Sequence, residues 1–336
     1  RELEFEKWDL DYATPKRIFA IARAFIKWKS IEHVRKKTHI DPFFLEKIQN
    51  IVLTRNALVV KEQKLLPADS SIVQQAKKQW YSDMQIAKIV GVNEAYIRKY
   101  RQKYSILPVI KKIDTLAGEF PSFTNYMYST YHGISHDTIP SRKKKKVIVL
   151  GSGSYRIGCS VEFDWCSVTT LSTLKKEGYE TIMLNFNPET VSTDFDSSDK
   201  LYFDEISLEK VLDIYEIEKA SGVIISMGGQ IANNLANKLD GAGVNVMGTH
   251  PKNIDRAEDR NKFSSILDTL WVDQPAWAEL TSTKEAFAFG KKYGYPVIIR
   301  PSYVLSGANM QVCMNEKQLK KFLEKIAHIS PEFPSV

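Results

Sequence analysis

Short apolar segments alternate with helical segments from residue 147 onward, and this alternation restricts the fold more than any other feature of the sequence. The apolar segments have the length of β-strands and cover residues 147–150, 181–184, 222–226 and 244–247. Crossover helices are expected between them, among others over 208–219 and 231–239. Strands and helices that alternate in this way form a parallel sheet with helices on its faces. A doubly wound, Rossmann-like domain is therefore predicted.

The preceding part of the chain is predicted to be all helical. Apolar residues recur at helical spacing after Thr14–Pro15 and after Asp41–Pro42, where a side chain that can cap a helix precedes a proline. Further helices are expected over 71–90 and 94–104, with a glycine turn between them. A helical module therefore precedes the sheet domain.

The end of the chain is predicted to combine helices with a β-hairpin. The helices are expected over 260–270, 283–293 and 316–328. The apolar run 295–301 and the segment 310–313 flank a loop that contains serine and glycine, as paired strands do. A third structural region thus follows the Rossmann-like one.

A polar, lysine-rich segment, 140–146, separates two parts of opposite charge. Up to Lys146 the chain has 28 Lys and Arg against 15 Asp and Glu, a net charge of +13, and after it 19 against 25, a net charge of −6. A basic region is compatible with nucleic acid, with an acidic partner domain or with solvated helix faces, and the last is the most frequent case. The change of charge indicates a domain boundary.

Several classes of protein are excluded by composition. No run of about 18 apolar residues predicts a membrane span. The first residues include several acids and no apolar run, which excludes a secretory signal. Three scattered cysteines are too few for a disulfide framework or a zinc site, so a reducing compartment is expected; they are Cys159, Cys166 and Cys313. The chain begins without methionine and stops at Ser335–Val336, and both ends are expected to be cut.

A glycine-rich loop, GSGSYRIG at 151–158, follows the first predicted strand and precedes a helix. Backbone N–H groups at such a turn favour anions. A dinucleotide fingerprint would need its third glycine at 156, which is arginine, and an acid after the second strand, where Asn185 and Asn187 stand. Nicotinamide and flavin binding are therefore disfavoured.

Charged residues gather after the first two predicted strands. Arg156 and Glu162 follow the first strand, and Glu189 follows the second, so all three are expected at the carboxyl edge of the sheet, where open sheets bind ligands. Asp164 and Asp194 belong to the same segments, and the alternative is that these two acids only cap helices and turns. A second glycine loop, MGGQ at 227–230, permits close backbone approach at the same edge.

In combination, these motifs resemble the second synthetase half of carbamoyl-phosphate synthetase. The matching segments are LGSGSYRIG (150–158), VEFDWC (161–166), NPETVSTD (187–194), GT (248–249), IDRAEDR (254–260) and RPSYVLSG (300–307). The helical part resembles that enzyme's oligomerisation domain in the segments 15–22, 40–48 and 113–120. The tryptophan of VEFDWC is similar to eukaryotic forms. The resemblance implies an α plus α/β architecture with a helical oligomerisation domain (1–140), a Rossmann-like pre-ATP-grasp domain (141–255) and the first part of an ATP-grasp domain (256–336).

The resemblance also implies roles for individual residues. Arg260 and Arg300 match arginines that contact ATP. Residues 302–309 match the small loop that folds over the triphosphate, in which Ser306–Gly307 stand where many bacterial members have two glycines. A helix surface charge and a strand-end ion pair are the alternatives for the two arginines. Arg156, Glu162 and Glu189 match the internal passage of carbamate, with buried carboxylates beside an arginine, and a structural ion-pair network is the alternative.

The implied reaction is the ATP-dependent phosphorylation of carbamate, within a synthesis of carbamoyl phosphate from bicarbonate, ammonia or glutamine, and two ATP. ATP and Mg²⁺ are the implied cofactors, and the Mg²⁺-binding carboxylates are expected beyond Val336, so that this segment is expected to be catalytically incomplete. The implied partners are the small-molecule substrates, a glutaminase domain or subunit and further copies of the chain, with no nucleic acid and no membrane. The expected compartment is the cytoplasm, with the mitochondrion as the alternative; the nitrogen source and the choice between the pyrimidine and arginine pathways stay open.

Two other interpretations remain. The segment 82–101 has the helix, glycine turn and basic second helix of a helix-turn-helix, which would make the front part a nucleic-acid-binding module. Another ATP-grasp ligase, such as a biotin carboxylase or a purine-pathway enzyme, would share the Rossmann-like opening and the glycine loop. Those ligases lack the helical module upstream.

Overall fold

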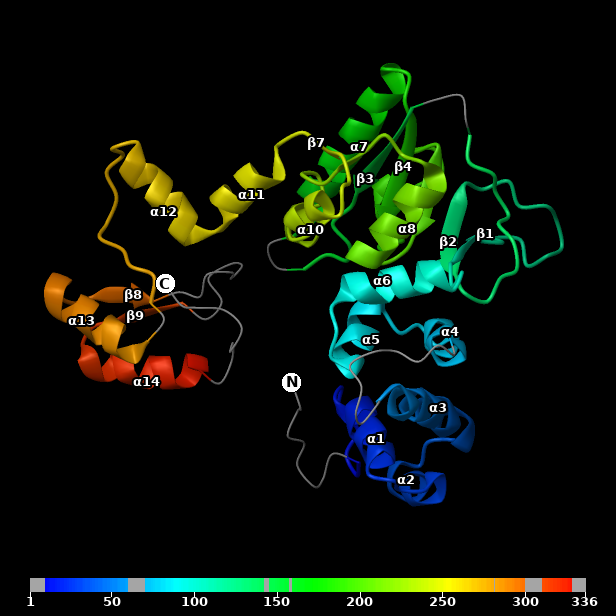
Figure 1. Cartoon of the computed structure of the whole chain (residues 1–336), viewed down its shortest axis with the longest axis horizontal. Coiled ribbons are helices and arrows are strands. Elements are labelled where there is room, and N and C mark those ends of the chain that lie inside the picture. Colours follow the sequence, from blue (N-terminus) through cyan, green and yellow to red (C-terminus); the bar gives the residue numbers. More distant parts are fainter. Residues whose placement is uncertain are drawn as a thin grey trace. The chain divides into compact units, whose positions relative to one another are not determined.

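The computed structural model describes residues 10–59, 70–141, 145–156, 159–280, 282–299 and 310–327, except for the side chains of 325–327. The chain divides into two units. The first comprises Arg1–Lys111 and Ser129–Asp137, and the second comprises Lys112–Tyr128 and Thr138–Val336. Most elements of both are labelled in Figure 1.

The described residues of the first unit are mainly helical, as predicted. Its helices are α1 (Arg17–Ile26), α2 (Ile31–Thr38), α3 (Pro42–Leu58), α4 (Ser71–Lys78), α5 (Asp83–Val90) and α6 (Glu94–Lys103). A short strand, β1 (Val109–Lys112), follows them. Helix α3 starts where expected, because the Asp41 side chain accepts a hydrogen bond from the backbone N–H of Phe43 and Pro42 takes the first turn.

Two expected helix boundaries in this unit are wrong. The helix predicted over 71–90 is two helices, because Trp80 has a left-handed backbone (φ 66°) and Ser82 starts α5 anew. The Ser82 side chain accepts from the N–H of Gln85, whose side chain accepts from the N–H of Ser82; this reciprocal cap is strong enough to begin a helix. The first helix begins at Arg17 and not after Thr14, whose carbonyl instead closes a turn with the N–H of Arg17.

Two apolar clusters and one buried ionic group hold the helices of the first unit. The α1–α3 cluster contains Ile21, Phe25, Val34, Leu45 and Val52, and the α3–α6 cluster contains Leu58, Val73, Ile86, Ile97, Tyr100 and Ile106. Beside the second cluster, the carboxylate of Asp83 pairs with Arg101 and Lys77, and these three side chains are at most 1% exposed.

The second unit contains the predicted parallel sheet. Its strands are β2 (Tyr126–Thr130), β3 (Lys146–Leu150), β4 (Glu180–Asn185), β5 (Lys200–Phe203), β6 (Gly222–Ile224) and β7 (Val246–Met247). They lie in the order β2-β5-β4-β3-β6-β7, and every neighbouring pair is parallel. Every residue of β3 and β4 is buried, as expected for strands with both faces covered. The predicted fold class is confirmed, although β2 and β5 were not among the expected strands.

Helices connect the strands of this sheet. They are α7 (Val161–Lys176), the 3-10 helix η1 (Val191–Thr193), α8 (Leu208–Glu218), α9 (Gly229–Asn233) and α10 (Ala236–Gly241). Two further helices, α11 (Pro251–Glu258) and α12 (Arg260–Thr269), follow the last strand. The connection through α7 runs from β3 to β4 and the one through α8 runs from β5 to β6, in opposite directions along the sheet. Because such crossovers are right-handed, α7 and α8 cover opposite faces.

The last region has the predicted helix and hairpin pattern. Helix α13 (Thr283–Tyr293) has the expected bounds, and the strands β8 (Val297–Ile299) and β9 (Gln311–Cys313) pair antiparallel, followed by α14 (Glu316–Ala327). The Ser282 side chain caps α13. Its core contains Ala286, Ile299, Cys313, Leu319 and Phe322.

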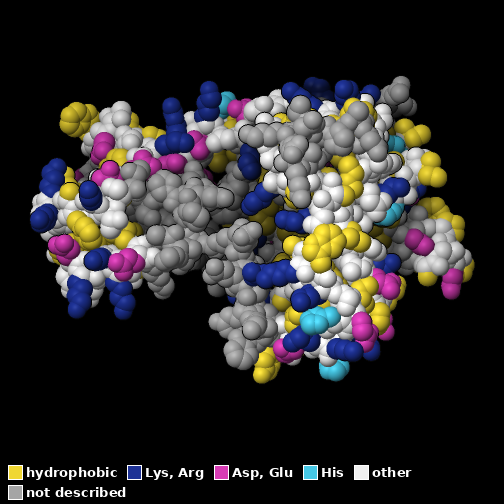
Figure 2. Space-filling view, turned by 60° about the horizontal axis from the view of Figure 1, so that its bottom comes forward, with side chains coloured by type: hydrophobic (Ala, Val, Ile, Leu, Met, Phe, Trp, Pro, Cys, Tyr) yellow, Lys and Arg dark blue, Asp and Glu magenta, His cyan; other side chains and the backbone are white. Residues whose placement is uncertain are grey.

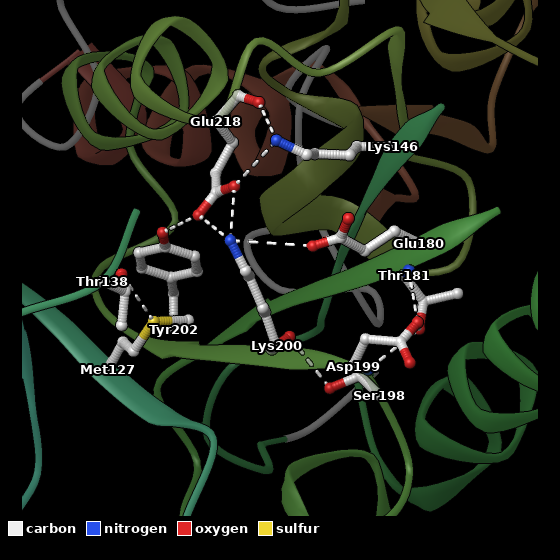
Figure 3. A network of polar contacts seen from close by, with 10 residues as sticks. All are labelled: Met127, Thr138, Lys146, Glu180, Thr181, Ser198, Asp199, Lys200, Tyr202 and Glu218. Atoms are coloured by element: carbon white, nitrogen blue, oxygen red, sulfur yellow. Dashed lines mark hydrogen bonds and ion pairs between the residues drawn. The ribbon is translucent and has the colours of Figure 1, made fainter. Parts of the chain in front are cut away.

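A buried polar network joins the amino-terminal ends of three strands to the end of α8 (Figure 3). The carboxylate of Glu218 accepts from the Lys200 ammonium at 2.8 Å and from the Tyr202 hydroxyl, and it lies 3.4 Å from the Lys146 ammonium. The Lys200 ammonium also lies 3.7 Å from Glu180. Charges at these positions are tolerated inside the domain because each one has an opposite partner.

Candidate functional site

The predicted ligand edge of the sheet lies where the strand order reverses. Strand β3 has β4 on one side and β6 on the other, so the chain leaves β3 in one direction and later returns on its other side. The loops after β3 and β6 therefore lie at the edge where open parallel sheets bind their ligands. These two loops are in backbone contact, since a Cβ on Gly228 would lie 2.4 Å from the carbonyl oxygen of Gly151.

The glycines after β3 are required by close packing against the end of β4. The N–H of Gly153 donates to the Asn185 side chain at 3.0 Å, and Gly153 has a left-handed backbone (φ 70°). A Cβ on Gly153 would lie 2.3 Å from the ring of Phe186, and one on Gly151 would lie 2.5 Å from the Asn185 side chain. Asn185, which stands where a dinucleotide site would have an acid, thus holds this loop in place. Residues 157 and 158 lie outside the described part of the chain.

Asp164 has the structural role that the sequence left as an alternative. Its buried carboxylate accepts from the backbone N–H of Ser192 at 3.2 and 3.3 Å, which fixes the loop after β4 to α7. Asp194 is exposed, and its backbone N–H closes a turn with the carbonyl of Val191. Asp164 is therefore a loop anchor.

The three residues predicted to line a passage are at the surface of this structure. Arg156, Glu162 and Glu189 are all exposed, so the expected buried arrangement is wrong for the described chain. The sequence could not show this, because it does not reveal which side of a loop faces solvent. A hydrogen bond from the Ser160 hydroxyl, together with backbone N–H groups at the start of α7, lowers the pKa of the Glu162 carboxyl. Glu162 is therefore a solvated anion at a helix start.

Arg260 lies on the wall of a cavity of about 480 Å³. It is the first residue of α12, which Asp259 caps by accepting from the N–H of Lys262 at 3.0 Å. The other lining residues are mostly aromatic and aliphatic, with a few polar ones; they include Ser264, Gln274, Trp277, Phe289, Tyr293 and Ile298. Apolar walls with few polar groups are typical of small-molecule sites. Arg300, Ser306 and Gly307 lie outside the described residues.

The structure adds a polar contact that the sequence analysis did not predict. The Gln230 side chain donates to one carboxylate oxygen of Glu258 at 2.7 Å, and the Asn233 side chain donates to the other at 3.3 Å. Gln230 belongs to the second glycine loop, and Glu258 precedes Arg260 by two residues. The three acids in IDRAEDR were a signal, but nothing in the sequence paired Glu258 with the glycine loop.

The basic front part does not carry its charge as one patch on the face that Figure 2 shows. There, Lys and Arg side chains are interspersed with acidic and apolar ones. Within the helix-turn-helix-like segment, Arg101 is fully buried against Asp83. This arrangement favours solvated helix faces over a phosphate-binding surface.

Neither a metal-binding cluster nor a membrane-spanning helix occurs in the described residues. No three His, Cys, Asp or Glu side chains among them gather as a metal site. In the same part of the chain, no helix combines the length and apolar composition needed to cross a bilayer.

Three family models match consecutive parts of the chain. Residues 3–105 match the oligomerisation domain of the carbamoyl-phosphate synthetase large chain, residues 143–256 the carbamoyl phosphate synthase preATP-grasp domain, and residues 259–334 the ATP binding domain of the carbamoyl-phosphate synthase L chain. Arg260 thus stands at the start of the ATP-binding match, and both glycine loops stand in the preATP-grasp match.

Similar proteins include fungal relatives over nearly the whole chain. The multifunctional protein URA2 of Saccharomyces cerevisiae is 50% identical over 98% of this chain and 15% of that protein. The mitochondrial carbamoyl phosphate synthase arginine-specific large chain of Schizosaccharomyces pombe is 50% identical over 98% of this chain and 28% of that protein. The carbamoyl phosphate synthase arginine-specific large chain of Cutaneotrichosporon cutaneum is 49% identical over 96% of this chain and 27% of that protein. The chain spans less than a third of each relative, and it belongs to the carbamoyl-phosphate synthetase large-chain family.

Proposed function

We propose that this chain supplies part of the nucleotide site at which its parent protein phosphorylates carbamate with ATP to form carbamoyl phosphate. The observation that carries the proposal is the position of Arg260 on the wall of a cavity in the segment that matches the ATP-binding domain. A guanidinium offers several N–H donors to phosphate oxygens and neutralises charge during phosphoryl transfer. The aromatic and aliphatic walls suit a purine base.

The start of α12 suits an anion for a second reason. The first turn of a helix presents unpaired N–H groups and the positive end of the helix dipole, and Arg260 occupies that turn. Among the described residues that line the cavity, Arg260 is the cationic one. We propose that Arg300, Ser306 and Gly307 complete the phosphate contacts after β8.

Mg²⁺ would accompany the ATP phosphates in this reaction. We expect its carboxylate ligands in other parts of the parent protein, and the three predicted domains (1–140, 141–255 and 256–336) remain part of the proposal. Arg156, Glu162 and Glu189 would line the path of carbamate only once another part of the parent protein covers their exposed side chains. Their common location at the carboxyl edge of the sheet supports this role.

The partners and the pathway belong to the same proposal. The match to an oligomerisation domain supports self-association through the first unit. The relatives include arginine-specific chains and multifunctional proteins, so cytosolic and mitochondrial forms both remain open. A glutaminase that supplies ammonia is proposed from the family alone.

The test is ATP formation from MgADP and carbamoyl phosphate by the longest natural polypeptide that contains this segment. Arg260→Ala should lower kcat/KM for ADP by about 100-fold, which corresponds to about 2.7 kcal/mol of transition-state stabilisation. Arg256→Ala is a matched control, because this exposed arginine belongs to the preceding helix, α11, and does not line the cavity. Unchanged kcat/KM in Arg260→Ala would contradict the role of Arg260, and a folded parent protein that forms no ATP would refute the function.

A further inference from the structure

We infer that Glu258 is a positioning residue for Arg260, and that Gln230 and Asn233 hold Glu258 in place. The inference rests on the proposed function, because it concerns the arginine assigned to the nucleotide. It connects the second glycine loop at the edge of the sheet with the nucleotide cavity.

Both carboxylate oxygens of Glu258 are engaged by neutral amide donors. Gln230 donates to one oxygen at 2.7 Å and Asn233 to the other at 3.3 Å, and all three side chains are partly buried. The two donors are three residues apart on α9 and therefore share one face of that helix. Hydrogen bonds from neutral donors to a carboxylate are charge-assisted and hold it in one orientation. The side chain of Glu258 is thus fixed on two sides.

The position of Glu258 constrains the start of helix α12, whose first residue is Arg260. Glu258 is the last residue of α11, Asp259 is extended (φ −79°, ψ 114°), and Arg260 is the first residue of α12. The junction between the two helices is a single non-helical residue. A shift of Glu258 would therefore move the first turn of α12 and the guanidinium on the cavity wall.

The donors themselves stand on an anchored loop. Gly228 packs against the carbonyl oxygens of Gly151 and Leu150, where a Cβ would come within 2.4 and 2.7 Å. Gly229 has a left-handed backbone (φ 58°), and a Cβ there would lie 3.2 Å from Cys159 and Phe163. The end of β3, the glycine loop and Glu258 therefore form a series of contacts, and the backbone at Asp259 links Glu258 to Arg260. Displacement of a reacting group by about 1 Å can lower a rate by about two orders of magnitude, so such a support has a kinetic effect.

An exchange of the two partners tests this series of contacts without removing any atoms of the scaffold. Gln230→Glu places two carboxylates against each other, and Glu258→Gln removes the charge that the amides bind. The double variant Q230E/E258Q restores an amide–carboxylate pair in the opposite sense, and the amide oxygen introduced at position 258 can still accept from Asn233. The control is Asp240→Asn, which removes a carboxylate from an exposed position on α10.

The measurement is kcat/KM for ADP in ATP formation by the parent protein, with the melting temperature measured alongside. Gln230→Glu should lower kcat/KM for ADP by about 10-fold or more, and the double variant should recover most of it, because supporting hydrogen bonds of this kind typically contribute about 10- to 100-fold. The inference is overturned if Gln230→Glu keeps wild-type kcat/KM, or if the double variant regains the melting temperature but not kcat/KM. A wild-type parent that forms no ATP would refute the proposed function, which is a separate result.

Discussion

Arg101 donates from Nε and Nη2 to both carboxylate oxygens of Asp83 at 2.7 to 2.9 Å, inside the first unit. The Lys77 ammonium approaches the same carboxylate at 3.1 Å, and the ring of Tyr131 lies over both cations. The arginine near the end of the helix-turn-helix-like segment therefore serves the interior of the unit. A charge inside a helical domain is costly unless it is paired, and this pairing makes Asp83 central to α4, α5 and α6.

Asp83→Asn should destabilise the first unit strongly. The substitution leaves two buried cations facing a neutral amide, and breaking a buried pair in this way costs about 3 to 5 kcal/mol. Site-resolved hydrogen exchange of α4 to α6 measures the loss as a lower free energy of opening. The control is Glu32→Gln, which removes an exposed pair with Arg35 and should leave the exchange of these helices unchanged. If the amides of α4 to α6 in Asp83→Asn keep the hydrogen-exchange protection of the wild type, the buried ion pairs of Asp83 do not stabilise these helices.

Tyr202 should make the second unit sensitive to alkaline pH. Burial, and then the adjacent carboxylate of Glu218, raise the pKa of Tyr202 far above its ordinary value of 10.0. The unfolded chain loses the phenolic proton near that value while the folded chain keeps it, so stability is retained below pH 10 and falls above it. The slope from this group is at most about 1.4 kcal/mol per pH unit.

Tyr202→Phe isolates this contribution. The free energy of unfolding should fall less steeply above about pH 10 in the variant than in the wild type, since phenylalanine has no proton to lose. Urea unfolding between about pH 8 and 11 gives the two slopes. Tyr12→Phe, at an exposed tyrosine, should keep the wild-type slope. If the free energy of unfolding falls with pH equally steeply in Tyr202→Phe and in the wild type, the Tyr202 phenol does not keep its proton in the folded state, and the prediction is wrong.

Gly228→Ala should destabilise the sheet domain. The new Cβ would meet two backbone carbonyl oxygens, those of Gly151 and Leu150, and backbone atoms at the end of a buried strand cannot move away as a flexible side chain would. Overpacking of this kind costs about 1 to 3 kcal/mol. Gly241→Ala is the matched control, because nothing lies within 4 Å of its added Cβ. The melting temperature should fall only in Gly228→Ala, and equal melting temperatures would contradict the loop contact.

The sequence predicted the elements that depend on local or periodic signals. Helix α13 has the expected bounds because Ser282 and Glu285 form a reciprocal cap, and β3 and β4 were found because both faces of a central parallel strand are apolar. The break at Trp80 was missed, since apolar spacing continues across it and only the cap at Ser82 interrupts the helix. Strands β2 and β5 were missed because neither contains a continuous run of aliphatic residues.

For the candidate site, the residues alone determined which loops follow the strands and which side chains those loops carry, because parallel strands bring their carboxyl ends to one edge. Resemblance to a family then assigned Arg260, and the structure places it on a cavity wall. Only the tertiary structure decided that Asp164 is an anchor, that Glu162 and Glu189 face solvent, and that Glu258 is held by Gln230. Burial and pairing depend on contacts between residues far apart in the sequence, and neither periodicity nor spacing specifies those contacts.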